Sequence, residues 1–152
     1  MNKILKLTST ILILTAGLGV ATTVNSANNY LLADNYHSHK KLEIQPGQPV
    51  PKVDLLVYPD TKKGWNLELK LTNFKFVPEA VNQNSNYYEG HAHLYINDEK
   101  ITRIYGNWYY IKNLEPGKNK IAVTLNTNKH EDLVSNGKII MDTEIIEVTA
   151  QK

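Results

Sequence analysis

Two histidines separated by a single residue are the part of this sequence best suited to chemistry. They lie in the segment Gly90-His91-Ala92-His93-Leu94-Tyr95-Ile96. Side chains on a β-strand alternate between its two faces, so His91, His93 and Tyr95 share one face, with the imidazoles about 6.6 Å apart along the strand. Rings at this spacing can lean together onto one metal ion at about 2.0 Å. Gly90, directly before the pair, leaves room for close approach.

A third histidine supplies the ligand that a pair lacks. His130 lies in a predicted loop, and loops at the ends of a sandwich often carry function. Three imidazoles can share one ion only if His130 comes within about 10 Å of the pair. Carboxylates of Glu89 and Asp132 are predicted auxiliary ligands or hydrogen-bond partners of the ligands. The thioether of Met141 is a further auxiliary ligand, and it would favour copper.

The donor set predicts copper or zinc as the metal, because imidazole alone or imidazole with carboxylate suits Zn(II) and Cu(II). The chain has no cysteine, which excludes a blue-copper centre. No Gly-x-Ser-x-Gly, phosphate-binding glycine loop, Cys-x-x-Cys or His-Glu-x-x-His occurs, and nothing indicates an organic cofactor. We therefore expect a binding protein and no enzyme, while a metal-assisted enzyme would need a pocket around the histidines.

Two alternatives compete with a metal site. A His-x-His pair on a strand is often a solvated face, and His37 and His39 have the same spacing within a predicted flexible arm, where metal would bind only adventitiously. The second alternative is a structural or interaction module with a protein partner. Its aromatic residues can pack across strands, surround a metal site or form a flat platform; they are Trp65, Tyr87, Tyr88, Tyr95, Tyr105, Trp108, Tyr109 and Tyr110.

The beginning of the chain reads as a secretory signal peptide over residues 1–26. Lys3 and Lys6 precede an apolar run at 11–20, and small residues follow up to Ser26 and Ala27, where cleavage is predicted. The run is shorter than the roughly 20 residues of a spanning helix. We therefore expect a periplasmic or extracellular protein with no membrane anchor after cleavage.

The charge balance changes once the signal peptide is set aside. The chain has 17 Lys and Arg against 15 Asp and Glu, and Lys3 and Lys6 belong to the signal, which leaves 15 of each sign. A neutral domain offers no electrostatic footprint for nucleic acid. Without cysteine it also has neither disulfides nor thiolate chemistry.

Period-two patterning predicts an all-β domain over residues 52–150, preceded by a flexible arm at 27–51 that includes a proline-rich stretch. Asn97 and Asp98 predict a tight hairpin turn, and a phase change in the last strand predicts a bulge near Thr143. Seven or eight strands with turn signals between them indicate an antiparallel β-sandwich of immunoglobulin-like or cupredoxin-like type. They cover residues 53–58, 66–76, 91–96, 101–105, 107–111, 121–125 and 138–148.

Two resemblances extend this reading. The Gly90-His91-Ala92-His93-Leu94-Tyr95 motif, with the pattern that runs on to His130, resembles a group of exported, poorly characterised bacterial domains of cupredoxin-like or immunoglobulin-like fold. The closing stretch from Leu114 is similar to the end of periplasmic copper-resistance proteins of the CopC type, which implies copper binding through an N-terminal histidine and a closing-loop histidine. Lys138 stands where that loop histidine is expected.

Overall fold

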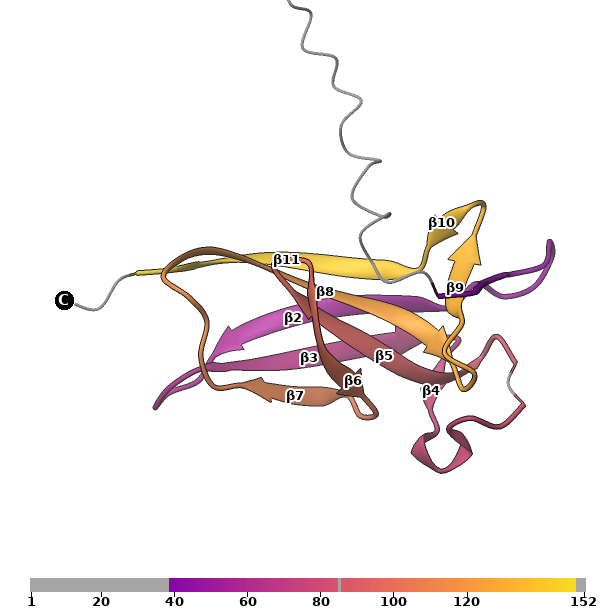
Figure 1. Ribbon diagram of the computed structural model, residues 1–152, viewed down its shortest axis with the longest axis horizontal. Helices are drawn as coiled ribbons and strands as arrows, with labels where there is room; N and C mark the ends of the chain where they lie inside the picture. Colours follow the sequence, from indigo (N-terminus) through magenta and orange to yellow (C-terminus); the bar gives the residue numbers. More distant parts are fainter. Residues whose placement is uncertain (1–38, 85, 150–152) are drawn as a thin grey trace, which may run out of the picture.

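The computed structural model describes residues 39–84 and 86–149, which form two β-sheets packed face to face (Figure 1). This confirms the prediction of an all-β sandwich. The elements in chain order are β1 (Lys41–Glu43), β2 (Lys52–Pro59), β3 (Trp65–Thr72), β4 (Lys75–Phe76), the 3-10 helix η2 (Pro78–Ala80), β5 (Glu89–Ile96), β6 (Glu99–Ile104), β7 (Trp108–Ile111), β8 (Gly117–Thr127), β9 (Asp132–Ser135), β10 (Lys138–Ile139) and β11 (Met141–Val148).

The predicted signal peptide at 1–26 and its cleavage site lie outside the described residues. The same holds for the arm up to residue 38, including His37. Over 39–84 and 86–149, no helix has the length and apolar character needed to cross a membrane.

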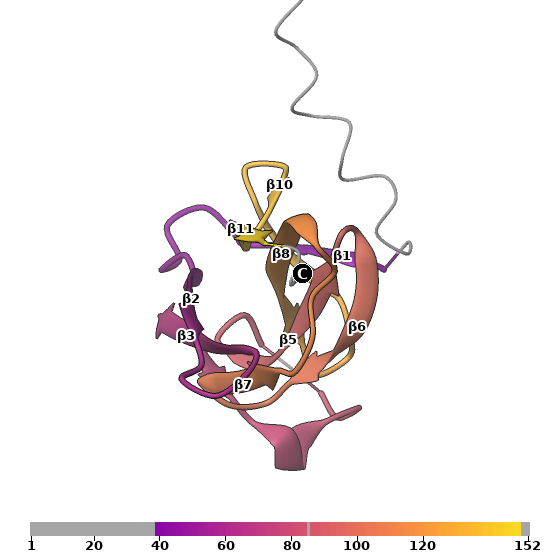
Figure 2. The same ribbon diagram turned by 90° about the vertical axis from the view of Figure 1, so that its left-hand side faces the viewer.

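The small sheet is antiparallel, with the order β2-β3-β7. In the large sheet β5 and β8 pair at the centre, β4 and β6 pair with β5, and β9 and β11 pair with β8. Figure 2 shows β2 and β3 on one side of the sandwich and β5, β6 and β8 on the other. Two pairings are parallel, β1 with β9 and β4 with β5, so the large sheet is mixed and not purely antiparallel as predicted.

Alternating side chains of both sheets form the apolar core between them. Because every second residue of a strand points inward, β2 and β3 contribute one row of leucines and β5 and β8 contribute the facing row. All are fully buried: Leu55, Leu67, Leu69, Ala92, Leu94, Ile121, Val123 and Leu125. This core is the one that the period-two pattern predicts.

The other face of the large sheet is also buried at its central strands β5 and β8, which the sequence did not predict. On β5, His91, His93 and Tyr95 lie in register beside Asn126, Thr124 and Ala122 of β8. All six have relative exposures of 0–1%. At β5 and β8 the large sheet therefore has an apolar layer on one face and a mostly polar buried layer on the other, and the histidine pair belongs to the polar layer.

Part of the predicted flexible arm belongs to the sandwich. Strand β1 pairs in parallel with β9, and the Ile44 amide donates to the Val134 carbonyl over 2.8 Å. Leu42 packs against the core and Ile44 lies within it, whereas Lys41 and Glu43 are exposed. A short apolar alternation thus fixes the chain here, directly after His39.

The apolar alternation over residues 138–148 changes face, but not through the bulge that was predicted. Strand β11 keeps a continuous register with β8 from Met141 to Val148, so the predicted bulge near Thr143 is wrong. Ile140 separates β10 from β11; its amide donates to Leu133 and its carbonyl accepts from Leu125. The change of face therefore falls at the break between two strands.

The hairpin between β5 and β6 follows the prediction. Asn97 and Asp98 both have positive φ angles, 51° and 69°, as a two-residue hairpin turn of type I′ requires. The turn brings β6 back along β5 and so places Lys100 beside the histidine face.

Candidate metal centre

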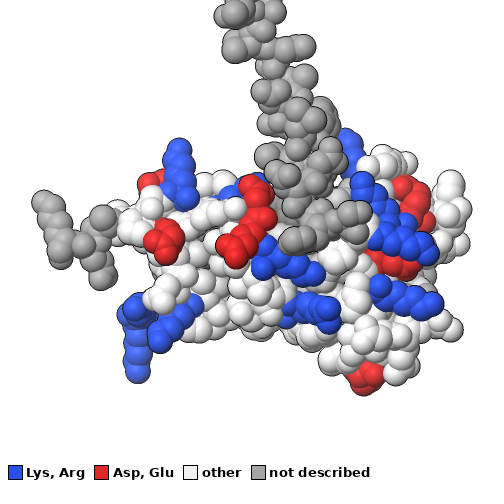
Figure 3. Space-filling view, viewed as in Figure 1, with Lys and Arg blue, Asp and Glu red and all other residues white. Residues whose placement is uncertain are grey.

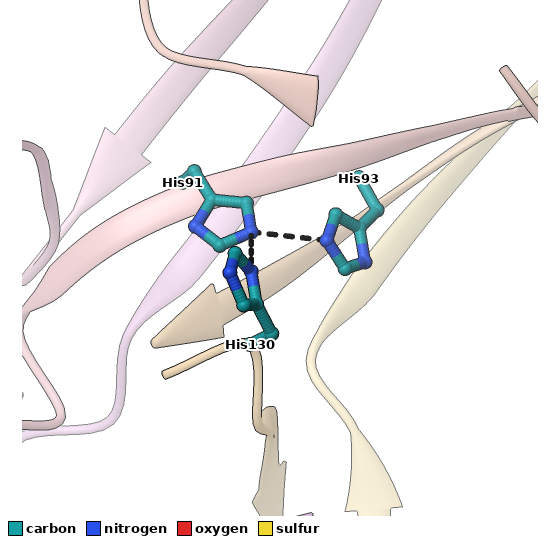
Figure 4. Close-up of side chains that lie close together, drawn as sticks. All are labelled: His91, His93 and His130. Atoms are coloured by element: carbon teal, nitrogen blue, oxygen red, sulfur yellow. Dashed lines mark hydrogen bonds between the residues drawn. The ribbon is translucent and has the colours of Figure 1, made fainter. Parts of the chain in front are cut away.

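Strand β5 sets the first two imidazoles of the site side by side. His91 and His93 project from the same face of the strand, and their rings lean toward each other (Figure 4). Their Nε2 atoms are 3.0 Å apart and their ring centroids 4.8 Å apart. The predicted geometry of the His-x-His pair is therefore present.

The turn between β8 and β9 carries the third imidazole. The His130 amide donates to the Thr127 carbonyl and the Thr127 amide donates to the Glu131 carbonyl, each over 2.9 Å. His130 has a φ of 64°, the left-handed conformation that closes a three-residue hairpin loop. Its Nδ1 lies 3.1 Å from His91 Nε2, and its Nε2 lies 2.8 Å from Asn82 Oδ1.

Gly90 permits the strand approach that supports this arrangement. A Cβ atom at Gly90 would lie 2.0 Å from the carbonyl oxygen of Asn126 on β8. Only glycine therefore lets β5 and β8 come this close next to His91, as the sequence analysis anticipates.

The three rings present nitrogens to one small volume. Their ligand nitrogens all lie within 4.8 Å of one another. Two nitrogens bound to one tetrahedral zinc ion are about 3.4 Å apart, so the separations of 3.0 and 3.1 Å around His91 are slightly shorter. Small ring movements bring His91, His93 and His130 to metal-ligand distances, and these three residues can hold one ion.

The imidazoles of the pair are held neutral. Burial, with the nearby charges of His130 and Arg103, lowers the pKa of His91 from 6.5 to about 3. Burial and the Lys100 ammonium lower the pKa of His93 from 6.5 to about 2. Burial also lowers the pKa of His130. Neutral imidazole is the form that binds a metal, so the site keeps its lone pairs down to acidic pH.

The Nδ1 atoms of His91 and His93 are buried, and neither has a hydrogen-bond partner in the structure. In metal-binding histidines the N–H of this second ring nitrogen usually donates a hydrogen bond to a carboxylate, a backbone carbonyl or water. Within the described ranges, the carboxylates expected for that role do not take it.

The predicted auxiliary residues lie apart from the three rings. Glu89 pairs with Lys75 over 3.4 Å, and Met141 is 37% exposed on β11. Asp132 is buried and accepts a 2.6 Å hydrogen bond from the Asn126 amide, while burial raises its pKa. Asp132 therefore borders the site through Asn126, and the charge of His39 acts on its carboxyl group.

Two residues beside the pair were missed by the sequence analysis. The His39 ring centroid lies 5.0 Å from that of His93. The Lys100 Nζ lies 3.2 Å from His93 Nε2 and 3.4 Å from His39 Nε2. The repeated His-x-His spacing at 37–39 is the available signal, but its polar surroundings are typical of a flexible arm.

The aromatic residues are divided among the site, the core and the exposed side of the small sheet, where the rings of Tyr58 and Trp108 are 6.1 Å apart between centroids. Tyr105 stands beside the site, 5.3 Å from His91 between ring centroids. Others pack against the core, including Trp65, Tyr87 and Tyr109. The large aromatic side chains exposed to solvent are Tyr58, Trp108 and Tyr110, all from the small sheet.

Charges of both signs surround the site. Lys100 and Arg103 act on the histidines from β6, and Lys40 pairs with Glu131 over 3.2 Å. Figure 3 shows basic and acidic side chains interspersed over the visible face, without a large region of one sign.

Comparison with known proteins gives no match to any family model, curated protein or solved structure. The resemblances to cupredoxin-like domains and to copper-resistance proteins therefore stay predictions. The geometry of the three histidines is the ground for assigning a function, since fold alone does not imply one.

Proposed function

We propose that this protein binds Zn(II) or Cu(II) through His91, His93 and His130. The observation that carries the proposal is the convergence of three imidazole nitrogens, with His91 Nε2 3.0 Å from His93 Nε2 and 3.1 Å from His130 Nδ1. Imidazole is a preferred ligand of both metals.

Hydrogen bonding among the rings satisfies this cluster poorly. A neutral imidazole has one N–H and one acceptor nitrogen. If His91 and His93 carry their protons on Nδ1, two buried donors lack partners and two lone pairs face each other at 3.0 Å, with only that of His93 also in reach of the Lys100 ammonium, at 3.2 Å. If a proton lies on one Nε2, the Nδ1 of that ring becomes a buried acceptor without a donor. A bound cation supports the first arrangement, because it takes up the facing lone pairs.

The site favours holding a metal over catalysis. His91 and His93 are fully buried. The hollow next to them on β6 is lined by Lys100, Ile101, Thr102, Arg103 and Tyr105, and none of the histidines at 39–84 and 86–149 lines it. A catalytic ion needs an open position that substrate can reach. Residues 1–26 resemble a signal peptide, and for that reason we place metal binding outside the cytosol. An exported domain can buffer or carry copper or zinc there.

Calorimetric titration of the purified protein with Zn(II) and Cu(II) tests the proposal. We expect one ion per chain, and an affinity at least about 100-fold weaker in the double variant His91→Ala/His93→Ala. Glu89→Gln is the matched control and keeps the wild-type affinity, because Glu89 pairs with Lys75. Circular dichroism in chelator checks that each variant is folded. Equal binding by wild type and double variant would refute the proposal.

A further inference from the structure

Four imidazoles form a row along one side of the large sheet. Centroid separations are 5.0 Å from His39 to His93, 4.8 Å from His93 to His91 and 4.8 Å from His91 to His130. Three of these rings make up the candidate metal centre, and the fourth belongs to the residues before β1. His39 therefore reaches the site from a separate part of the chain.

An ammonium group stands between His39 and the other rings. Lys100 Nζ contacts His93 Nε2 at 3.2 Å and His39 Nε2 at 3.4 Å. The first distance is close to the separation of about 3.4 Å between two ligands of a tetrahedral ion. Lys100 Nζ thus lies at the spacing of a fourth ligand as seen from His93.

Lys100 and a metal ion compete for the same lone pair. The acceptor nitrogen of His93 can receive a hydrogen bond from the ammonium or bind an ion, but it cannot do both. Two cations this close also repel each other. Lys100 is only half-buried, and its long flexible stem lets the ammonium move outward into water.

We infer that His39 is the fourth ligand of the metal, taking the position that Lys100 leaves when the ion binds. This inference rests on the proposed function and adds to it a closed coordination sphere and a displaced cation. The ion then joins the residues before β1 to β5 and to the turn between β8 and β9. Four protein ligands with no open position are typical of sites that hold zinc rather than catalyse, in keeping with storage or carriage.

Titration of the full chain with Zn(II) and Cu(II) tests the fourth ligand. We expect His39→Ala to weaken metal binding by at least about 10-fold. This is the smallest loss typical of mutating a residue that only hydrogen-bonds to a metal ligand, and the loss of a ligand itself should be no smaller. His37→Ala is the matched control and should bind as wild type. Equal affinity of His39→Ala and wild type, or an equal loss in His37→Ala, would overturn the inference.

A substitution of Lys100 tests whether its ammonium group competes with the metal ion. Lys100→Met keeps the stem and removes the charge, so we expect it to bind the ion at least about 5-fold more tightly, the factor for one pair of unit charges near 4 Å in water. Unchanged or weaker binding would show that Lys100 is no competitor and would overturn this part.

Hydrogen exchange gives a readout that affinity does not. The Ile44 and Asp132 amides, which bond to Val134 and Lys40, mark the pairing of β1 with β9. Metal should slow their exchange in wild type and leave it unchanged in His39→Ala. Binding by wild type without this protection rejects His39 as a ligand and leaves the three-histidine site intact. Absence of binding by wild type rejects the proposed function itself.

Discussion

His130 has a φ of 64°, in the left-handed region of backbone conformation. A Cβ atom makes this region costly, although asparagine, aspartate and histidine adopt it more often than other residues with a side chain. Such strain costs about 1–3 kcal/mol and tends to be retained at functional sites. The gain here is a ring that closes the cluster, with Nδ1 facing His91 and Nε2 against Asn82.

His130→Asn should separate binding from folding. Asparagine accepts the left-handed turn, so we expect the free energy of unfolding of the metal-free protein to stay within about 1 kcal/mol of wild type. Metal affinity should fall at least about 10-fold, because a ligand is lost. Urea unfolding in chelator and calorimetric titration measure the two quantities. Retained affinity would exclude His130 from the site.

Acid should destabilise the metal-free protein from about pH 6.5 downward. The folded pKa values of His91 and His93, about 3 and about 2, lie below their ordinary value of 6.5. The unfolded chain therefore binds protons below pH 6.5 that the folded chain does not. The slope approaches about 1.4 kcal/mol per pH unit for each histidine.

Urea midpoints in chelator at about pH 7.5 and about pH 5 measure this effect. The double variant His91→Ala/His93→Ala should show a much smaller difference between the two. A wild-type midpoint that does not change over this interval would contradict the burial of neutral imidazoles.

At the residue scale, spacing in the sequence predicts the His91/His93 pair and points to His130, but not its neighbours. Three residues give too little pattern to distinguish a flexible tail from a short parallel strand. The pairing of β1 with β9, and with it the position of His39, could therefore not be predicted from the local sequence. Lys100 depends on the hairpin register, which shifts between Leu94 and Tyr95. The alternation of Leu42 and Ile44 and the turn at Asn97 are local signals, but they specify neither the strand that pairs with β1 nor the β6 side chain that reaches His93.

At the scale of the elements, the pairing of β5 with β8 positions the histidine pair. A Cβ atom at Gly90 would meet the Asn126 carbonyl at 2.0 Å, and backbone on both sides leaves little room to adjust. The site and the sheet thus depend on the same glycine.

Gly90→Ala should therefore damage both stability and binding. We expect a loss of about 3 kcal/mol in unfolding free energy, near the upper end of overpacking effects, and weaker metal binding in the fraction that folds. Gly106→Ala is the matched control, because a Cβ there meets nothing within 4 Å. Chemical denaturation compares the two, and equal stability would contradict the close approach.

The long strands could be predicted because alternation over five or more residues is a strong signal. Leu67, Leu69 and Leu71 are an example, and they form the inward row of β3. Strands of two or three residues, such as β4 and β10, have no such signal. The predicted number of strands was therefore smaller than the number observed.

On the scale of the whole molecule, the large sheet is buried on both faces at its central strands β5 and β8. An alternating strand of an antiparallel sheet predicts one solvated face, and this rule predicts a solvated position for the histidine pair. Lys100, Tyr105, His39 and the turn with His130 lie over that face. The position of these residues over the histidine face depends on tertiary packing, which no local sequence pattern predicts.

Metal should stabilise the whole fold, since the ligands come from β5 and from a turn 39 residues away in the chain. Free metal at 100 times its dissociation constant adds about 2.7 kcal/mol. We expect a rise in melting temperature with Zn(II) or Cu(II) that chelator reverses, and none with magnesium. The double variant His91→Ala/His93→Ala should show no rise, and an equal rise there would place the bound metal elsewhere.

The most direct test of the three-histidine site is an anomalous difference map from crystals of the zinc-loaded protein. The account predicts one strong peak about 2.0–2.1 Å from His91 Nε2, His93 Nε2 and His130 Nδ1. A map with no peak among these nitrogens, or with its strongest peak at another residue, would contradict it.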